Sequence, residues 1–194
     1  MSGISRPQPV PEIVRAVEAR CRELGFEKSS REETGRLLKA LAATVDAGTI
    51  AEFGGGCGYG TAWLRAGLQP GARLLTVELD EQGAAALREA FAGDPQVEVI
   101  HGDWRELLAH GPFRLAFVDV GPAKDEDAGL VIDALAPGGV AILDDFTPVE
   151  LWPAEWRGKP DARRERWLLD DRLHATELRV SLDHAVILAT RKPS

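Results

Sequence analysis

A glycine-rich segment constrains the fold of this chain more than any other feature. Five of the seven residues from Gly54 to Gly60 are glycines, and Glu52 stands two positions ahead of them. A mostly apolar run, 49–53, precedes the segment, and an amphipathic pattern follows it. A strand, a glycine loop and a helix in this order point backbone N–H groups at a ligand. Glycine suits such a loop because it tolerates a positive φ and has no Cβ to hold the ligand away.

The spacing of these glycines argues against a dinucleotide site. That fingerprint needs the frame G-x-G-x-x-G, and its third glycine is Tyr59 here when counted from Gly54 and Thr61 when counted from Gly56. The frame that fits is acid-x-G-x-G-x-G, beginning at Glu52. A carboxylate beside the loop repels a pyrophosphate and attracts a ligand with ammonium and sulfonium charges, such as S-adenosylmethionine. For the loop alone, a plain flexible turn is the alternative.

The next two predicted strands also lead to residues that suit a nucleoside. The strand 73–78 ends in Glu78, which is well placed to accept hydrogen bonds from both ribose hydroxyls. The strand 97–101 is followed by Asp103 and Trp104. Asp103 could cap a helix or accept from an exocyclic amine, and Trp104 could face an adenine ring or pack in the core.

Two further strands are followed by carboxylates. The strand 113–118 precedes Asp119, and the strand 139–143 precedes Asp144 and Asp145. Ligands of open parallel sheets bind at the C-terminal ends of the strands. The acids that follow the strands are therefore expected to meet at one site.

Taken together, these motifs resemble the class I S-adenosylmethionine-dependent methyltransferases, and within them the small O-methyltransferases of the catechol and caffeoyl-CoA type. The resemblance covers 29–191 and includes the glycine loop, the strand-end acids and a Pro-Gly-Gly turn at 137–139. It implies an α/β, Rossmann-like methyltransferase fold. The expected sheet has seven mostly parallel strands, with one antiparallel strand from a C-terminal hairpin over 176–190 and helices on both faces.

The resemblance also implies which residues bind the cofactor and which act on the substrate. Those expected at S-adenosylmethionine are Glu52, Phe53, Gly54, Gly55, Gly56, Gly58, Tyr59, Glu78, Leu79, Gly102, Asp103, Trp104 and Asp119. Asp119 and Asp145 are the candidate catalytic residues. The implied reaction transfers a methyl group to a small-molecule acceptor, with a hydroxyl oxygen favoured and nitrogen or carbon left open.

The chain departs from the resembled family where that family's members bind a metal. Metal-dependent members usually carry Asp-x-x-Lys after strand four and Asp-Asn after strand five. Here Pro122 takes the lysine position, Lys124 falls two residues late, and Asp145 replaces the asparagine. Asp119, Asp144 and Asp145 could still hold Mg²⁺ or Mn²⁺ through oxygen ligands, or they could line the site without a metal. Lys124 is expected to be solvated rather than to act as a base.

Length and charge indicate one domain and a small substrate. The expected organisation of the 194 residues is a lead-in and helix over 1–28 and a single methyltransferase domain over 29–194. The net charge of −8 argues against a nucleic-acid substrate. No membrane span or secretory signal is visible, and a cytoplasmic location is expected. Cys21 and Cys57 suggest no disulfide framework. A homodimer stays open.

The N-terminal helices and the segment after the fifth strand are the two candidate acceptor regions. The second is rich in tryptophan. Trp152 and Trp156 stand four residues apart there and could wall a pocket for a flat acceptor or pin the connection to the core. Three rival functions stay open: a dehydrogenase, a non-catalytic module that binds the cofactor or a partner, and a methyltransferase acting on a macromolecule.

Overall fold

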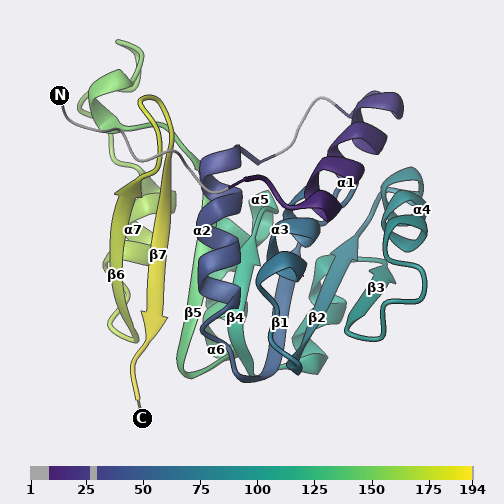
Figure 1. The fold of residues 1–194 in the computed structure, drawn as a ribbon. Helices are drawn as coiled ribbons and strands as arrows, with labels where there is room; N and C mark the ends of the chain where they lie inside the picture. The colour runs from purple at the N-terminus through teal and green to yellow at the C-terminus, as the bar shows by residue number, and fades with distance from the viewer. Residues whose placement is uncertain (1–8, 27–29, 194) are drawn as a thin grey trace, which may run out of the picture.

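The strands form one seven-stranded sheet in the computed structural model of the protein, which describes residues 9–26 and 30–193 (Figure 1). They are β1 Ala47–Phe53, β2 Gly71–Glu78, β3 Val97–His101, β4 Phe113–Val118, β5 Leu135–Phe146, β6 Leu173–Arg179 and β7 Ala185–Arg191. The sheet order is β3-β2-β1-β4-β5-β7-β6. β7 pairs antiparallel with both β5 and β6, and the other neighbouring strands pair in parallel. The predicted fold class is confirmed.

Helices cover both faces of this sheet. The α-helices are α1 Glu12–Glu23, α2 Glu32–Ala42, α3 Tyr59–Gly67, α4 Glu81–Ala90, α5 Gly121–Lys124, α6 Ala128–Asp133 and α7 Ala162–Leu168. Two 3₁₀ helices are η1 Trp104–His110 and η2 Val149–Leu151. Within the described ranges, no helix combines the length and the apolar character that a membrane span requires.

The alternation of side chains along the strands divides the core into two layers. On β1, Ile50 packs with α1, α2 and α3, which lie in front of the sheet in Figure 1. Ala51 and Phe53 belong to the layer on the opposite face, which η1, α5, α6 and α7 cover. Successive residues of a strand point to opposite faces. Glu52 shares the face of Ile50, and its carboxylate therefore points towards α3.

The strand order creates one reversal point at the middle of the sheet. The chain runs outward from β1 to β2 and β3, and then returns to place β4 on the other side of β1. The loops that follow β1 and β4 therefore diverge at the C-terminal ends of these strands. Such a switch point is where open α/β sheets bind their ligands.

One local difference from the sequence expectation concerns β5. β5 starts at Leu135 and continues to Phe146, so Asp144 and Asp145 lie inside the strand rather than beyond it. Its register shifts against β4 and again against β7, between Leu143 and Phe146. The shift against β7 lies where Asp144 and Asp145 stand, so these two residues leave the regular ladder.

The cysteines do form a disulfide, between Cys21 on α1 and Cys57 in the glycine loop. The expectation that they are unlinked is wrong, because sequence spacing does not show which residues the fold brings together. α1 packs against α3, and the disulfide links α1 covalently to the glycine loop that follows β1.

Breaking this disulfide should lower the free energy of unfolding by about 3 to 4 kcal/mol. The intact bond closes a loop in the unfolded chain and so reduces the conformational entropy that the chain gains on unfolding. The cysteines stand 36 residues apart, which sets that loop length. Urea denaturation with and without a reductant measures the change. Cys21→Ala should be destabilised in both conditions and insensitive to the reductant. Wild-type protein that is equally stable in both would contradict the prediction.

Candidate active site

The glycine loop turns sharply directly after β1. Gly54, Gly56 and Gly58 have φ values of 90°, 54° and 100°, which side-chain-bearing residues rarely adopt. The N–H groups of Gly54 and Gly55 both donate to the carbonyl of Val77, at 3.1 and 2.9 Å, and fix the loop to β2. A Cβ on Gly54 would lie 2.8 Å from a methyl group of Val120, so the close approach to the loop after β4 also requires glycine.

Glu52 is a buried carboxylate at the base of this loop. The hydroxyls of Thr61 and Thr76 both donate to its Oε2, the latter at 2.7 Å. Burial raises the pKa of Glu52 to about 7, although the two hydrogen bonds oppose the shift. Glu52 lines a small cavity whose other walls are Ser30, Gly54, Gly55, Gly56, Cys57, Tyr59, Gly60, Phe117 and Asp119.

Glu78 connects the glycine loop to the next helix. Its Oε2 accepts from the N–H of Gly56 at 2.7 Å, and its Oε1 accepts from the N–H of Asp80 at 2.8 Å. Asp80 in turn caps α4 by accepting from the N–H of Gly83 at 2.9 Å. The sequence singled out Glu78 for the ribose alone, whereas in the structure it also holds the loop in place.

A second cavity lies beside Glu78. It is lined by Gly54, Val77, Glu78, Leu79, Gly102, Asp103, Trp104 and Val120. Asp103 caps η1 through the N–H of Arg105 at 2.9 Å. The ring of Trp104 is buried edge-on against Phe53, with 5.9 Å between the ring centres, and its Nε1 has no hydrogen-bond partner within the described residues. Capping and core packing therefore coexist here with a place in the cavity wall.

Three carboxylates meet at the ends of β4 and β5. Asp119 and Asp145 both contact the ammonium group of Lys124, whose Nζ lies 2.8 Å from Asp119 Oδ1 and 3.4 Å from Asp145 Oδ2. Burial raises the pKa of Asp119 to about 6, while the lysine opposes the shift. Lys124 is itself buried, so the expectation that it is solvated is wrong.

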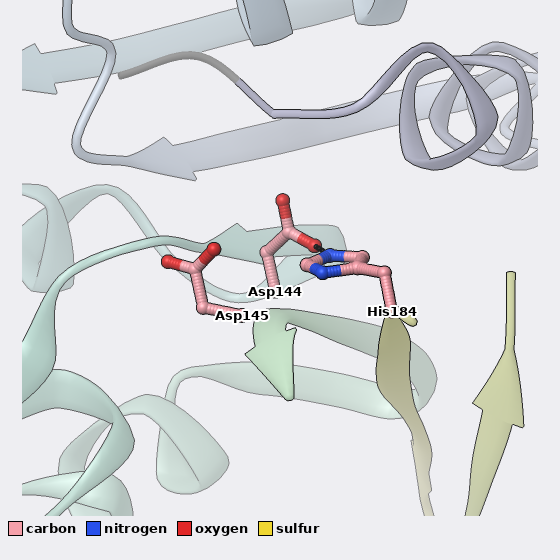
Figure 2. Close-up of side chains that lie close together, drawn as sticks. All are labelled: Asp144, Asp145 and His184. Atoms are coloured by element: carbon pink, nitrogen blue, oxygen red, sulfur yellow. Dashed lines mark hydrogen bonds and ion pairs between the residues drawn. The ribbon is translucent and has the colours of Figure 1, made fainter. Parts of the chain in front are cut away.

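The third carboxylate, Asp144, pairs with a histidine (Figure 2). Its Oδ1 lies 2.7 Å from Nε2 of His184, at the start of β7, and accepts from the hydroxyl of Thr34 at 3.2 Å. Burial opposes ionisation of Asp144, but the hydrogen bond and charge of His184 prevail and leave its pKa below the ordinary value. The sequence offered no signal for His184, because its role depends on β7 pairing with β5.

A larger groove joins these groups along the edge of the sheet. Its volume is about 830 Å³, and its walls are Ser30, Arg31, Gly54, Gly56, Glu78, Leu79, Asp119, Val120, Asp145 and His184. Most of the predicted site residues therefore lie along one surface. Phe53 and Gly58 line none of the cavities described here, because the ring of Phe53 is in the core and Gly58 is the N-cap of α3. Ser30 and His184 are additional wall residues.

A separate cavity of about 350 Å³ adjoins Asp145 in the segment after β5. Trp152 and Trp156 meet edge to face there, with ring centres 6.3 Å apart. Arg164 stacks over Trp152 and forms ion pairs with Asp161 and Glu177. Trp152 is pinned by a hydrogen bond to the backbone, whereas Trp156 is half exposed. Both rings line the cavity, and the ring of Trp152 also packs inward, so both alternatives for the tryptophans are present.

The middle of the sequence resembles known methyltransferases. Residues 51–146, from the middle of β1 to the end of β5, match the family model described as a methyltransferase domain. This region, just under half of the chain, is therefore similar to the methyltransferase domain family. The match contains the glycine loop and every strand-end acid discussed above.

Two curated relatives are named as catechol O-methyltransferases. Catechol O-methyltransferase B of Danio rerio is 29% identical over 117 residues, covering 55% of this chain and 44% of that protein. Catechol O-methyltransferase of Mycobacterium tuberculosis is 35% identical over 94 residues, covering 45% of this chain and 42% of that protein. The chain spans about half the length of the curated relatives it matches.

Solved structures share the fold over nearly the whole chain. An O-methyltransferase from Bacillus cereus in complex with SAH has a TM-score of 0.77 at 23% identity, covering 95% of this chain and 93% of that one. An O-methyltransferase from Streptomyces achromogenes in complex with SAM also has a TM-score of 0.77 at 23% identity, covering 95% and 92%. At this identity the likeness establishes the fold.

Glu52→Gln should make the protein more stable at pH 8 by about 2 to 3 kcal/mol and give no gain at pH 4.5. The unfolded carboxyl ionises near its ordinary value of 4.5 and the folded one at about 7, so wild-type stability falls as the pH rises between these values. The glutamine keeps an oxygen for Thr61 and Thr76. Urea denaturation at both pH values measures the difference, with the exposed Glu98→Gln as control. A variant no more stable at pH 8 would contradict the assignment.

Proposed function

We propose that this protein transfers a methyl group from S-adenosylmethionine to a hydroxyl oxygen of a small-molecule acceptor. The observation that carries the proposal is the line of carboxylates Glu52, Glu78 and Asp119 along the glycine loop at the sheet's reversal point. Such a site repels phosphate and attracts a cationic nucleoside. The family match and the named relatives support the same reaction.

In this proposal the cofactor lies across the ends of β1, β2 and β4. Its methionine ammonium is bound near Glu52 and Asp119, which line the same small cavity. Its ribose hydroxyls donate to Glu78, whose two oxygens keep free lone pairs beside their backbone hydrogen bonds. The adenine fills the cavity of Leu79, Asp103 and Trp104, where the unpartnered indole N–H is available to a ring nitrogen.

The protein's chemical task is then mainly alignment. A sulfonium methyl group is already electrophilic, so catalysis requires an acceptor oxygen held in line behind it and the exclusion of water. Asp119 lines the groove that also contains Asp145, and burial raises the pKa of Asp119 to about 6. At neutral pH it is therefore mainly ionised and still basic enough to assist loss of the hydroxyl proton. Asp145, which lines both the groove and the acceptor cavity, is the second candidate.

The acceptor in this proposal is a flat, small molecule in the cavity beside Asp145. The walls that support this choice are the rings of Phe146, Trp152 and Trp156. Aromatic walls favour an aromatic or otherwise planar acceptor. A volume of about 350 Å³ suits a small molecule and is too small for a macromolecule, although a single side chain or base would fit.

Glu78→Ala should weaken binding of S-adenosylmethionine and S-adenosylhomocysteine by at least about 30-fold, because it removes the ribose acceptor and releases the N–H of Gly56. Isothermal titration measures the affinity. Glu98→Ala, an exposed acid on β3, is the matched control and should bind like wild type. Well-folded wild-type protein that binds neither ligand would refute the proposed function. Binding without turnover of any acceptor would favour a non-catalytic cofactor-binding module.

Trp156→Ala should raise KM for a phenolic acceptor about ten-fold and leave the cofactor affinity unchanged, because this half-exposed ring lines only the acceptor cavity. The measurement is a methyl-transfer assay with catechol and related phenols, followed by cofactor titration of the same variant. Leu182→Ala, at an exposed position away from both cavities, is the control. An unchanged KM would remove Trp156 from the acceptor site.

A further inference from the structure

The ammonium group of Lys124 lies at the centre of the acid cluster. Its Nζ is 2.8 Å from Asp119 Oδ1, 3.0 Å from the carbonyl oxygen of Asp144 and 3.4 Å from Asp145 Oδ2. The side chain is 3% exposed. Three oxygens from two different strand ends therefore converge on one positive charge that is almost completely removed from solvent.

The backbone around Lys124 is firmly held. Its N–H donates to Val120 at 3.1 Å, and its carbonyl accepts from Nε1 of the fully buried Trp167 at 2.9 Å. The next residue, Asp125, forms a two-pronged ion pair with Arg163, at 2.8 and 2.6 Å. The ammonium is thus placed by a rigid support rather than by a mobile surface side chain.

The remaining acid has partners of its own. Oδ1 of Asp144 lies 2.7 Å from Nε2 of His184 and accepts from the hydroxyl of Thr34 at 3.2 Å. Asp144, Asp145 and His184 present ligand atoms within 4.8 Å of one another, but one oxygen of Asp144 and Nε2 of His184 are already engaged with each other.

A divalent cation does not fit this arrangement. It would share Asp119 and Asp145 with an ammonium group that already contacts one oxygen of each, and it would stand next to that positive charge. Two carboxylates with one lysine carry a net charge of −1, whereas an open site would offer both charges to the ion. The sequence also differs here from the metal-dependent pattern, because Pro122 takes the usual lysine position and the lysine falls two residues later, at Lys124.

We propose that Lys124 is the resident cation of the Asp119–Asp145 cluster, standing in for the divalent metal of metal-dependent relatives and making this chain metal-independent. Lys124 lines none of the cavities described above, so it acts as a positioning residue behind the two carboxylates. It holds Asp145, the one described non-glycine residue with a positive φ, at 70°. The inference rests on the proposed function, because it concerns the catalytic step. Its test measures metal binding and does not require turnover.

The test is a Mn²⁺ titration of the purified protein followed by electron paramagnetic resonance, which reports free Mn²⁺ directly. Wild-type protein should bind no Mn²⁺ at this cluster. Lys124→Met keeps the aliphatic stem and leaves the ammonium position vacant, and it should bind Mn²⁺ at least about ten-fold more tightly than wild type because the repelling charge is gone. Lys39→Ala on α2 controls for loss of a lysine elsewhere, and Lys124→Arg should exclude the ion like wild type.

Each outcome decides the inference. Mn²⁺ bound by wild-type protein and lost in Asp119→Asn would overturn it, as would a folded Lys124→Met protein that binds no more Mn²⁺ than wild type. If Lys124→Met does not fold, the wild-type titration still decides whether the cluster binds metal. Cofactor titration of wild-type protein with and without EDTA separates the two claims. No binding in either condition refutes the proposed function, whereas binding or turnover that EDTA abolishes overturns only the inference about the metal.

Discussion

The buried carboxylate of Glu52 is the group on which the rest of the site depends. It stands at the end of the central strand and receives hydroxyl donors from α3 and β2, so three elements meet at one side chain. Keeping an acid without a cationic partner in the core costs stability as it ionises. A cationic ligand at the adjacent loop would repay that cost. Burial of Glu52 therefore lowers the stability of the protein without ligand, and it favours binding of a cationic ligand beside that carboxylate.

The sequence predicted those features that repeat a local pattern. The glycine frame, the apolar strands and the acids after them follow from spacing, and the structure brings Gly54, Glu78 and Asp119 to one groove. Features that depend on long-range pairing were missed. His184 reaches Asp144 only because β7 runs antiparallel beside β5, and Cys21 reaches Cys57 only because α1 packs on α3. The local sequence around these residues contains no pattern that predicts either contact.

Lys124 shows how a correct local argument gave a wrong result. A lysine at a helix start is usually solvated, and acids follow Lys124 in the sequence, but in the structure Asp125 pairs with Arg163 and Asp127 pairs with Arg105. With those acids engaged elsewhere, the lysine turns inward to Asp119 and Asp145. A charge run in sequence is therefore a poor guide to burial wherever partners come from other elements, because a compensated ion can be buried at far lower cost than an isolated one.

The two halves of the site are built by different physical means. The proposed cofactor half is fixed by hydrogen bonds that link β1, β2 and the glycine loop, so its shape follows directly from the sheet. The proposed acceptor half lies on one long connection after β5, held by Arg164 between aromatic rings and acids. Substitutions in that connection can reshape the acceptor cavity without disturbing the strands beneath it. Substrate choice in this fold can therefore vary while the cofactor and the chemistry stay the same, and this explains why motifs on the strands identify the reaction class but not the acceptor.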